Sequence, residues 1–207
     1  METREPGYSA YLEKKYLPGR RWYLHRFFYP KLFRSFGSPD TIIDLGCGTG
    51  EFLDYCRKRK HEALGIDSNE AFAKRCQENG FNVHLDSIYE LRSVKNQHFR
   101  YAVCDNVLEH LEFTELRQFF DRIETLLSPG GILFCIVPGR RGFKCDPTHK
   151  TYISYELLSN LIKNRNLKIE PGYFHPFNLG FVDRFLYLNM QVFEIIKRHS
   201  SESEYRT

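Results

Sequence analysis

The fold is decided by the stretch Asp44-Leu45-Gly46-Cys47-Gly48-Thr49-Gly50. It follows a short β-rich run at 41–45 and precedes a helical pattern at 50–59 that ends in basic residues. A glycine-rich turn between a strand and a helix lets a ligand approach the backbone closely. The spacing G-x-G-x-G lacks the third glycine of the G-x-G-x-x-G dinucleotide fingerprint. The acidic residue two positions before the first glycine suits an ammonium group better than a phosphate, which disfavours a nicotinamide site.

From Thr41 onward, β-rich runs alternate with helical patterns, which is typical of βαβ units and a parallel sheet. Ser68 is the expected N-cap of a second helix that ends at Asn79-Gly80, and Ser154 is the expected N-cap of a later one. Further strands are predicted at 62–66, 81–85, 99–104, 131–137 and 167–173, further helices at 114–127, 155–165 and 181–187, a turn at 128–130, and one or two aromatic helices within 8–36. The segment 191–197 is either a final strand, which we favour, or a continuing helix.

Asp67 closes the second predicted strand, where a carboxylate can accept both hydroxyls of a ribose in a doubly wound fold. Together with the glycine loop, the segments 65–67, 85–87 and 127–131 resemble the successive motifs of the class I S-adenosylmethionine-dependent methyltransferases. The resemblance implies a Rossmann-like, doubly wound α/β sheet of about seven strands, the last one antiparallel, with helices on both faces. It also implies that S-adenosylmethionine is the cofactor, with its ribose on Asp67.

The adenine is expected near Asp86 and Ser87, and the methionine end near Gly46 and Asp105. The residues predicted to bind the cofactor are Asp44, Gly46, Cys47, Gly48, Gly50, Asp67, Ser68, Asp86, Ser87, Asp105 and Asn106.

Two segments after strand ends carry the candidates for catalysis. Glu109 and His110 follow the fourth strand, and Asp146 and His149 lie in the loop at 139–150 after the fifth. Because the carboxyl ends of parallel strands meet at one edge of a sheet, we expect these four residues to share a rim. His149, assisted by Asp146 and His110, is predicted to act as the general base on a hydroxyl. Alternatively, Glu109, His110 and His149 are ligands of a divalent ion that lowers the pKa of that hydroxyl.

The Glu-His pair followed by a loop histidine resembles the ubiquinone-type O-methyltransferases and the small-RNA 2′-O-methyltransferases, which implies an oxygen acceptor and a metal. Asn106 stands where the metal-binding RNA enzymes carry an acidic residue, so this site is one carboxylate short. The plainer alternative is that Glu109 and His110 cap the next helix and that His149 is an ordinary loop histidine.

Composition sets the remaining expectations. The chain has 207 residues, 42% hydrophobic residues and a net charge of +4, without a long apolar run or a secretion signal, so we expect a cytoplasmic protein. Six scattered cysteines are expected to be reduced thiols. We divide the chain into an aromatic helical cap at 1–40, a methyltransferase domain at 41–199 and a polar tail at 200–207.

We expect methylation of an oxygen on a small-molecule, lipid-linked or sugar acceptor. The alternatives are RNA 2′-O-methylation, which requires a contiguous basic face, and a cofactor-binding subunit without its own activity. The basic loop residues Arg140, Arg141, Lys144 and Lys150 either contact an anionic acceptor or are simply solvated. The aromatic segment 173–197 either covers the sheet or docks on a membrane surface or a second subunit.

Overall fold

The computed structural model describes residues 3, 5–15, 19–32, 34, 36, 41–178 and 189–199. The helix predicted at 181–187 and the tail at 200–207 lie outside the described residues.

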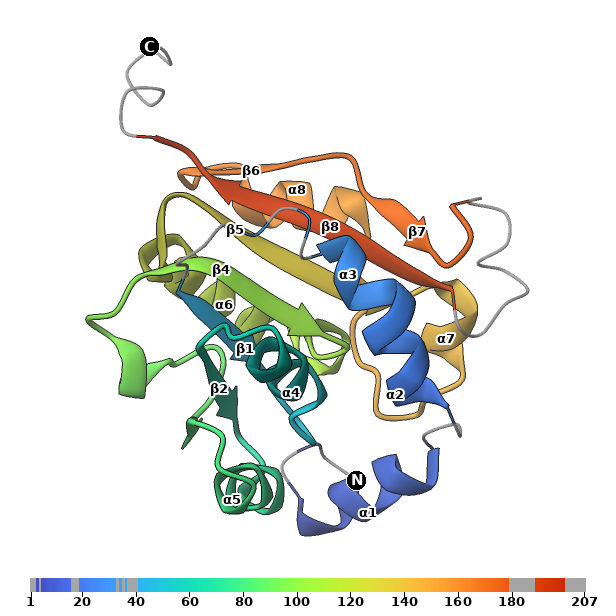
Figure 1. Ribbon diagram of the computed structural model, residues 1–207. Coiled ribbons are helices and arrows are strands. Elements are labelled where there is room, and N and C mark those ends of the chain that lie inside the picture. Colours follow the sequence, from blue (N-terminus) through green and yellow to red (C-terminus); the bar gives the residue numbers. More distant parts are fainter. Residues whose placement is uncertain are drawn as a thin grey trace.

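The centre of the molecule is one mixed β-sheet with the strand order β3-β2-β1-β4-β5-β8-β6, and β7 also pairs with β8 (Figure 1). Neighbouring strands from β3 to β5 run parallel, and β8 runs antiparallel to β5. The predicted fold class is therefore confirmed. The strands are β1 Ile42–Leu45, β2 Ala63–Asp67, β3 Val83–Leu85, β4 Phe99–Asp105, β5 Leu127–Pro138, β6 Leu167–Ile169, β7 Tyr173–His175 and β8 Met190–Lys197.

Helices cover both faces of this sheet (Figure 1). They are α1 Pro6–Lys15, α2 Arg20–Tyr23, the π-helix η1 Leu24–Phe28, α3 Tyr29–Leu32, α4 Glu51–Lys58, α5 Glu70–Glu78, the 3-10 helices η3 Arg92–Val94 and η4 Leu108–His110, α6 Phe113–Leu126, α7 Arg140–Lys144 and α8 Tyr155–Ile162. The helices α6 and α8 bury their apolar faces in one core, and the segment from α2 to α3 joins α4 in another.

Three local predictions need correction. The N-cap of α5 is Asn69 rather than Ser68, because the Asn69 side chain accepts hydrogen bonds from the N–H groups of Ala71 and Phe72. The strand predicted at 167–173 is two strands, β6 and β7, both paired with β8. The turn predicted at 128–130 lies within β5, where the pairing with β4 shifts register.

The N-terminal segment forms part of the second core. Phe28, Tyr29 and Leu32 are fully buried and pack in one cluster with Ile42 of β1 and Phe134 of β5. These buried side chains therefore cover the sheet. Within the described part of the chain, no helix is long and apolar enough to cross a membrane.

Adjacent phenylalanines on η1 test this packing. Phe28 is 0% exposed and Phe27 is 47% exposed. We expect Phe28→Ala to lower the free energy of unfolding by about 3–5 kcal/mol, because it leaves a cavity between η1 and the sheet. Phe27→Ala is the matched control and should change it by no more than about 0.5 kcal/mol. Urea denaturation measures both, and equal losses would contradict the packing described.

Candidate functional site

The glycine loop leaves the carboxyl end of β1 and enters α4. Gly46, Gly48 and Gly50 all have positive φ, at 83°, 51° and 77°. A Cβ on Gly46 would lie 2.4 Å from a methyl group of Val107, so that position requires glycine for packing. A Cβ on Gly48 would meet no atom within 4 Å, so the backbone at this position borders open space. The loop therefore leaves its middle glycine accessible to a ligand.

Asp67 ties the loop to the end of β2. Its carboxylate accepts hydrogen bonds from the N–H of Gly48 at 2.7 Å and from the N–H of Asn69 at 2.8 Å. The N–H groups of Gly46 and Cys47 both donate to the carbonyl of Ile66, at 2.7 and 3.0 Å. These bonds hold the glycine loop against the neighbouring strand end.

Three buried carboxyl groups gather at the ends of β1, β2 and β4. Burial raises the pKa of Asp44 well above its usual range, and the nearby charges of Asp105 and Asp67 raise it further. Burial also raises the pKa of Asp67 and of Asp105. Like charges in a low-dielectric setting disfavour ionisation, so this cluster favours a cationic ligand.

Asp86 and Ser87 lie beside this cluster, because the N–H of Asp86 donates to the carbonyl of Asp67 at 3.0 Å. The Asp86 carboxylate accepts from the N–H of Ser87 at 2.7 Å and from the N–H and hydroxyl of Ser93, both at 2.8 Å. Asp86 thus stabilises the loop that follows β3. Ser68 is half-buried next to Asp67.

Asp105 and Asn106 continue the cluster after β4. Asn106 has a positive φ of 55°, and its side-chain amide donates to the Asp105 carboxylate at 2.6 Å. Arg20 of α2 is the functional candidate that the sequence did not indicate. Its positive charge lowers the pKa of Asp105, and it forms an ion pair with Glu51 at the start of α4. No motif marks Arg20, because only tertiary packing brings it to the glycine loop.

A second cluster lies next to the first, at the segments that follow β4 and β5. Glu109 is fully buried, and His110 and Asp146 are nearly so. Nε2 of His149 lies 3.9 Å from Oε1 of Glu109 and 3.8 Å from Oδ2 of Asp146. The structure thus brings together the four residues that were expected to share a rim. Burial raises the pKa of the Cys104 thiol on β4 well above its usual range, and the nearby Cys135, Glu109, Asp44 and Asp105 raise it further.

Backbone carbonyl groups orient both histidines. Nδ1 of His149 lies 2.9 Å from the carbonyl oxygen of Phe143, and Nδ1 of His110 lies 3.1 Å from that of Thr148. A carbonyl oxygen only accepts, so we assign the proton of each neutral ring to Nδ1. This leaves the lone pair on Nε2, and in His149 that atom faces two carboxylates.

The N-terminal helix α1 reaches both clusters. The hydroxyl of Tyr8 lies 3.4 Å from Nε2 of His110, and the Tyr8 ring packs edge-on against His110 and Phe72. The buried Asn69 side chain donates to the carbonyls of Thr3 and Glu5, both at 3.0 Å. These bonds hold Thr3 and Glu5 beside the start of α5.

The basic residues of the loop lie at the surface. Arg140 and Arg141 on α7 are exposed, as is Lys144, and Lys150 forms a 3.5 Å ion pair with Glu112.

Comparison with known proteins agrees with this geometry. Residues 20–172 match the model of a protein family described as a methyltransferase domain. The chain belongs to the class I S-adenosylmethionine-dependent methyltransferases. A methyltransferase domain on this fold makes the protein an enzyme.

Individual relatives are distant. A candidate methyltransferase of Geobacillus sp. (strain WCH70) is 31% identical over 114 residues, which are 51% of this chain and 46% of the relative, so the match spans about half of either protein. An S-adenosylmethionine-dependent methyltransferase from Archaeoglobus fulgidus superposes with a TM-score of 0.70 at 22% identity, over 91% of this chain and 99% of that one.

A Burkholderia thailandensis N1-methyltransferase, solved with 1,6-didemethyltoxoflavin and S-adenosylhomocysteine, gives a TM-score of 0.64 at 19% identity, over 92% of this chain and 87% of that one. These structural similarities establish the methyltransferase fold.

The carboxylate cluster should make stability depend on pH in a defined direction. Because the pKa of Asp44 is raised in the folded protein, folding gains nothing from its ionisation and loses stability as the pH rises through that pKa. At about pH 8 we expect Asp44→Asn to raise the melting temperature, by about 2–4 °C for each kcal/mol of relieved strain. The gain should shrink toward about pH 4, near the pKa of an aspartate in the unfolded chain, because the Asp44 carboxyl group of the folded protein is already neutral there.

Asp121→Asn is the control, since this carboxylate is 64% exposed and paired with Arg165. It should not raise the melting temperature at either pH. A lower melting temperature for Asp44→Asn at high pH would contradict the electrostatic account of the cluster.

Proposed function

We propose that this methyltransferase acts on a hydroxyl oxygen, with His149 as the group that accepts the hydroxyl proton. The observation that supports it most is the position of Nε2 of His149, which faces the buried carboxylates of Glu109 and Asp146 beside the glycine loop.

The first cluster fits the cofactor. S-adenosylmethionine combines an ammonium group, a sulfonium and a ribose, and when bound it supplies an activated methyl group for displacement by a nucleophile. Asp44 and Asp105 suit the cationic end, because burial disfavours their negative charges until a cation arrives. Arg20 suits the carboxylate of the amino-acid portion. The carboxylate of Asp67 suits the ribose hydroxyls.

The remaining predicted cofactor residues are proposed to line the same space. Gly48 offers open room for the ligand, and Asp86, Ser87 and Ser68 lie beside Asp67, where the adenosine would extend. The shape of the glycine loop is set by Gly46, Cys47, Gly50 and Asn106, which we place on the side of the loop away from the ligand.

The second cluster can remove a proton without other help. Nδ1 of His149 donates to the Phe143 carbonyl, so Nε2 can take the proton from an acceptor hydroxyl while the oxygen forms its bond to the methyl carbon. The resulting imidazolium lies between Glu109 and Asp146, whose negative charges stabilise it. His110 and Tyr8 act as positioning residues at the edge of this space.

A divalent ion is the second candidate for activating the hydroxyl. Ligand atoms of Glu109, His110 and His149 lie within 4.8 Å of one another, and Asp146 supplies a further carboxylate near His149. Two imidazoles and a carboxylate suit manganese, iron or zinc. However, Nε2 of His110 already lies against the Tyr8 hydroxyl, so the donor set fits an ion only in part. We therefore favour the general base.

The proposed acceptor is a small molecule or a lipid-linked or sugar hydroxyl. The net charge of +4 is too small to argue for RNA as the acceptor. Free thiols at all six cysteines agree with a reaction in the cytoplasm.

Replacement of His149 tests the proposed base. With a panel of phenolic and glycosidic hydroxyl acceptors, we expect His149→Gln to slow S-adenosylhomocysteine formation by about 10²–10⁴-fold while leaving the cofactor affinity unchanged. The control His61→Gln changes a histidine in the loop before β2 and should leave the rate unchanged. An unaffected rate in His149→Gln would refute the role of His149, and loss of turnover after EDTA treatment, restored by Mn²⁺, would favour the metal.

A further inference from the structure

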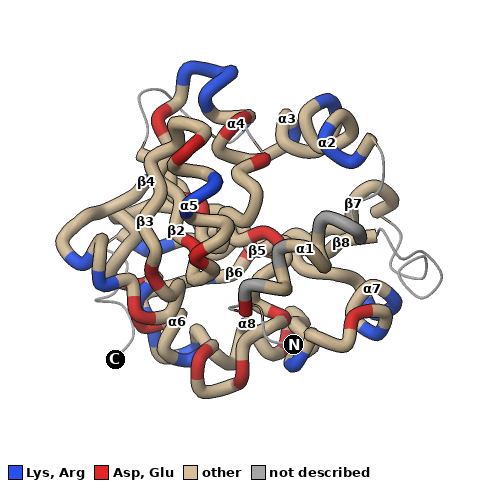
Figure 2. The backbone as a smooth tube through the Cα atoms, turned by 90° about the horizontal axis from the view of Figure 1, so that it is seen from below, with Lys and Arg blue, Asp and Glu red and all other residues tan. Residues whose placement is uncertain are grey.

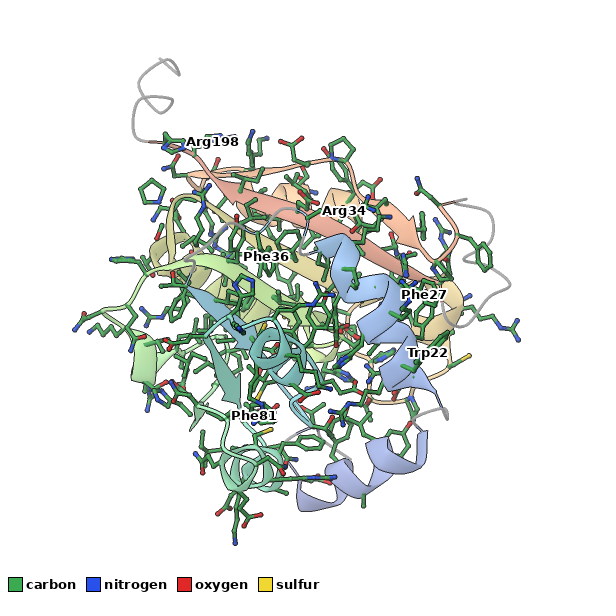
Figure 3. All side chains as sticks on the ribbon, viewed as in Figure 1. Trp22, Phe27, Arg34, Phe36, Phe81 and Arg198 are labelled. Carbon is green, nitrogen blue, oxygen red and sulfur yellow. The ribbon has the colours of Figure 1, made fainter. Side chains whose placement is uncertain are left out.

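The most exposed apolar surface of the described residues lies on the N-terminal helices. Trp22 is 66% exposed and Phe27 is 47% exposed, and their rings contact each other edge-to-face with centroids 5.4 Å apart (Figure 3). Trp22 and Phe27 thus form a continuous aromatic surface that points away from the core.

The π-helical turn explains why these two rings meet. Residues five apart lie on different sides of an α-helix, whereas the i→i+5 pattern of a π-helix brings them nearly above one another. The π-helix η1, Leu24–Phe28, follows α2 directly, and it aligns Trp22 with Phe27. The inward face of the same turn carries the buried Leu24 and Phe28. The backbone irregularity therefore lets one segment cover the sheet and still present paired aromatic rings outward.

The surroundings of this aromatic pair are cationic. No Asp or Glu occurs between Glu13 and Asp40, and that stretch contains seven basic residues, namely Lys14, Lys15, Arg20, Arg21, Arg26, Lys31 and Arg34. Of these, Arg21, Arg26, Lys31 and Arg34 are exposed. The guanidinium of Arg26 lies 5.3 Å from the centroid of the Phe27 ring. Arg20 and Arg21 form ion pairs with Glu51 and Asp54 of α4, so the positive charge of this surface comes from the exposed Arg26, Lys31 and Arg34.

We infer that Trp22, Phe27, Arg26 and Arg34 form a docking surface for an anionic lipid bilayer. Tryptophan and phenylalanine side chains on a basic amphipathic helix insert at the boundary between headgroups and acyl chains, and basic residues beside them attract anionic headgroups. A nucleic acid is less suited to this surface, because the rings pack against each other and against Arg26 rather than standing apart as platforms for bases.

The position of the surface fits delivery of an acceptor. Figure 2 shows the basic residues of α2 and α3 on the same side of the molecule as those of α7, with β7 and β8 between them. The helix α7 begins the loop that carries His149. A bilayer held at this side would present a lipid-linked hydroxyl near the site; this last step rests on the proposed function, whereas the docking itself does not.

Vesicle sedimentation tests the inference. We expect the protein to bind vesicles of phosphatidylglycerol and phosphatidylcholine more tightly than vesicles of phosphatidylcholine alone, and to dissociate as salt is added. Trp22→Ser/Phe27→Ser should weaken this binding at least about tenfold, because the inserted rings are lost. Arg26→Glu/Arg34→Glu should weaken it by about 25-fold or more, at about fivefold for each cation removed.

Phe113→Ser is the matched control, because Phe113 is 53% exposed and lies on α6 between Glu112 and Glu115. It should bind vesicles as the wild-type protein does. Calorimetry with S-adenosylmethionine should give unchanged affinity for all these variants, which separates this inference from the proposed function.

Three results would overturn the inference. The first is equal affinity for both vesicle types, and the second is unchanged binding by Trp22→Ser/Phe27→Ser. The third is a different occupant of the surface. This would be shown by binding of a single-stranded RNA oligonucleotide without binding of vesicles, or by a dimer in sedimentation velocity that Trp22→Ser/Phe27→Ser converts to monomers.

Discussion

The bond from the Gly48 N–H to the Asp67 carboxylate, 2.7 Å long, is the contact on which the site depends. It joins the turn after β1 to the end of β2, at a point where the backbone of Gly48 borders open space. It also brings Asp67 close to Asp44 and Asp105, where burial and mutual repulsion raise the pKa of the Asp44 carboxyl group. The fold thus places buried carboxyl groups at the strand ends, where their ionisation costs free energy. A bound cationic ligand lowers that cost. The carboxyl groups that favour ligand binding at this site therefore lower the stability of the ligand-free protein.

Much of the fold could be predicted from local patterns. The strand at 42–45, the helix that ends at Asn79-Gly80 and the Ser154 cap follow from periodicity and capping chemistry, which act over a few residues. The errors arise where tertiary contacts, rather than the local sequence, determine the structure. Ser68 and Asn69 are both good N-caps, and Asn69 also bonds to the carbonyls of Thr3 and Glu5. The π-turn at η1 has no sequence signature, because packing of Phe28 and Tyr29 on the sheet imposes it.

The residues of the site likewise divide into those that the local sequence predicts and those that only the packed structure brings there. Asp44, Asp67, Glu109 and His149 could be proposed because each lies at the carboxyl end of a strand or in the segment after it, and parallel topology brings such positions to one edge. Arg20 and Tyr8 could not be proposed, because they come from helices whose placement only the packed structure shows. The second carboxylate near His149 is that of Asp146, which the loop at 139–150 already offered as a candidate, whereas position 106 holds an asparagine.

The most direct test of the central claim is calorimetric titration of S-adenosylhomocysteine into the wild-type protein, Gly48→Arg and Gly80→Arg. Gly48 and Gly80 both have positive φ and open space at the Cβ position, so both substitutions bring similar backbone strain. Gly80 lies beyond the end of α5 and is not part of the glycine loop. The account predicts binding to the wild-type protein and to Gly80→Arg and none to Gly48→Arg, whereas equal binding to all three would contradict it.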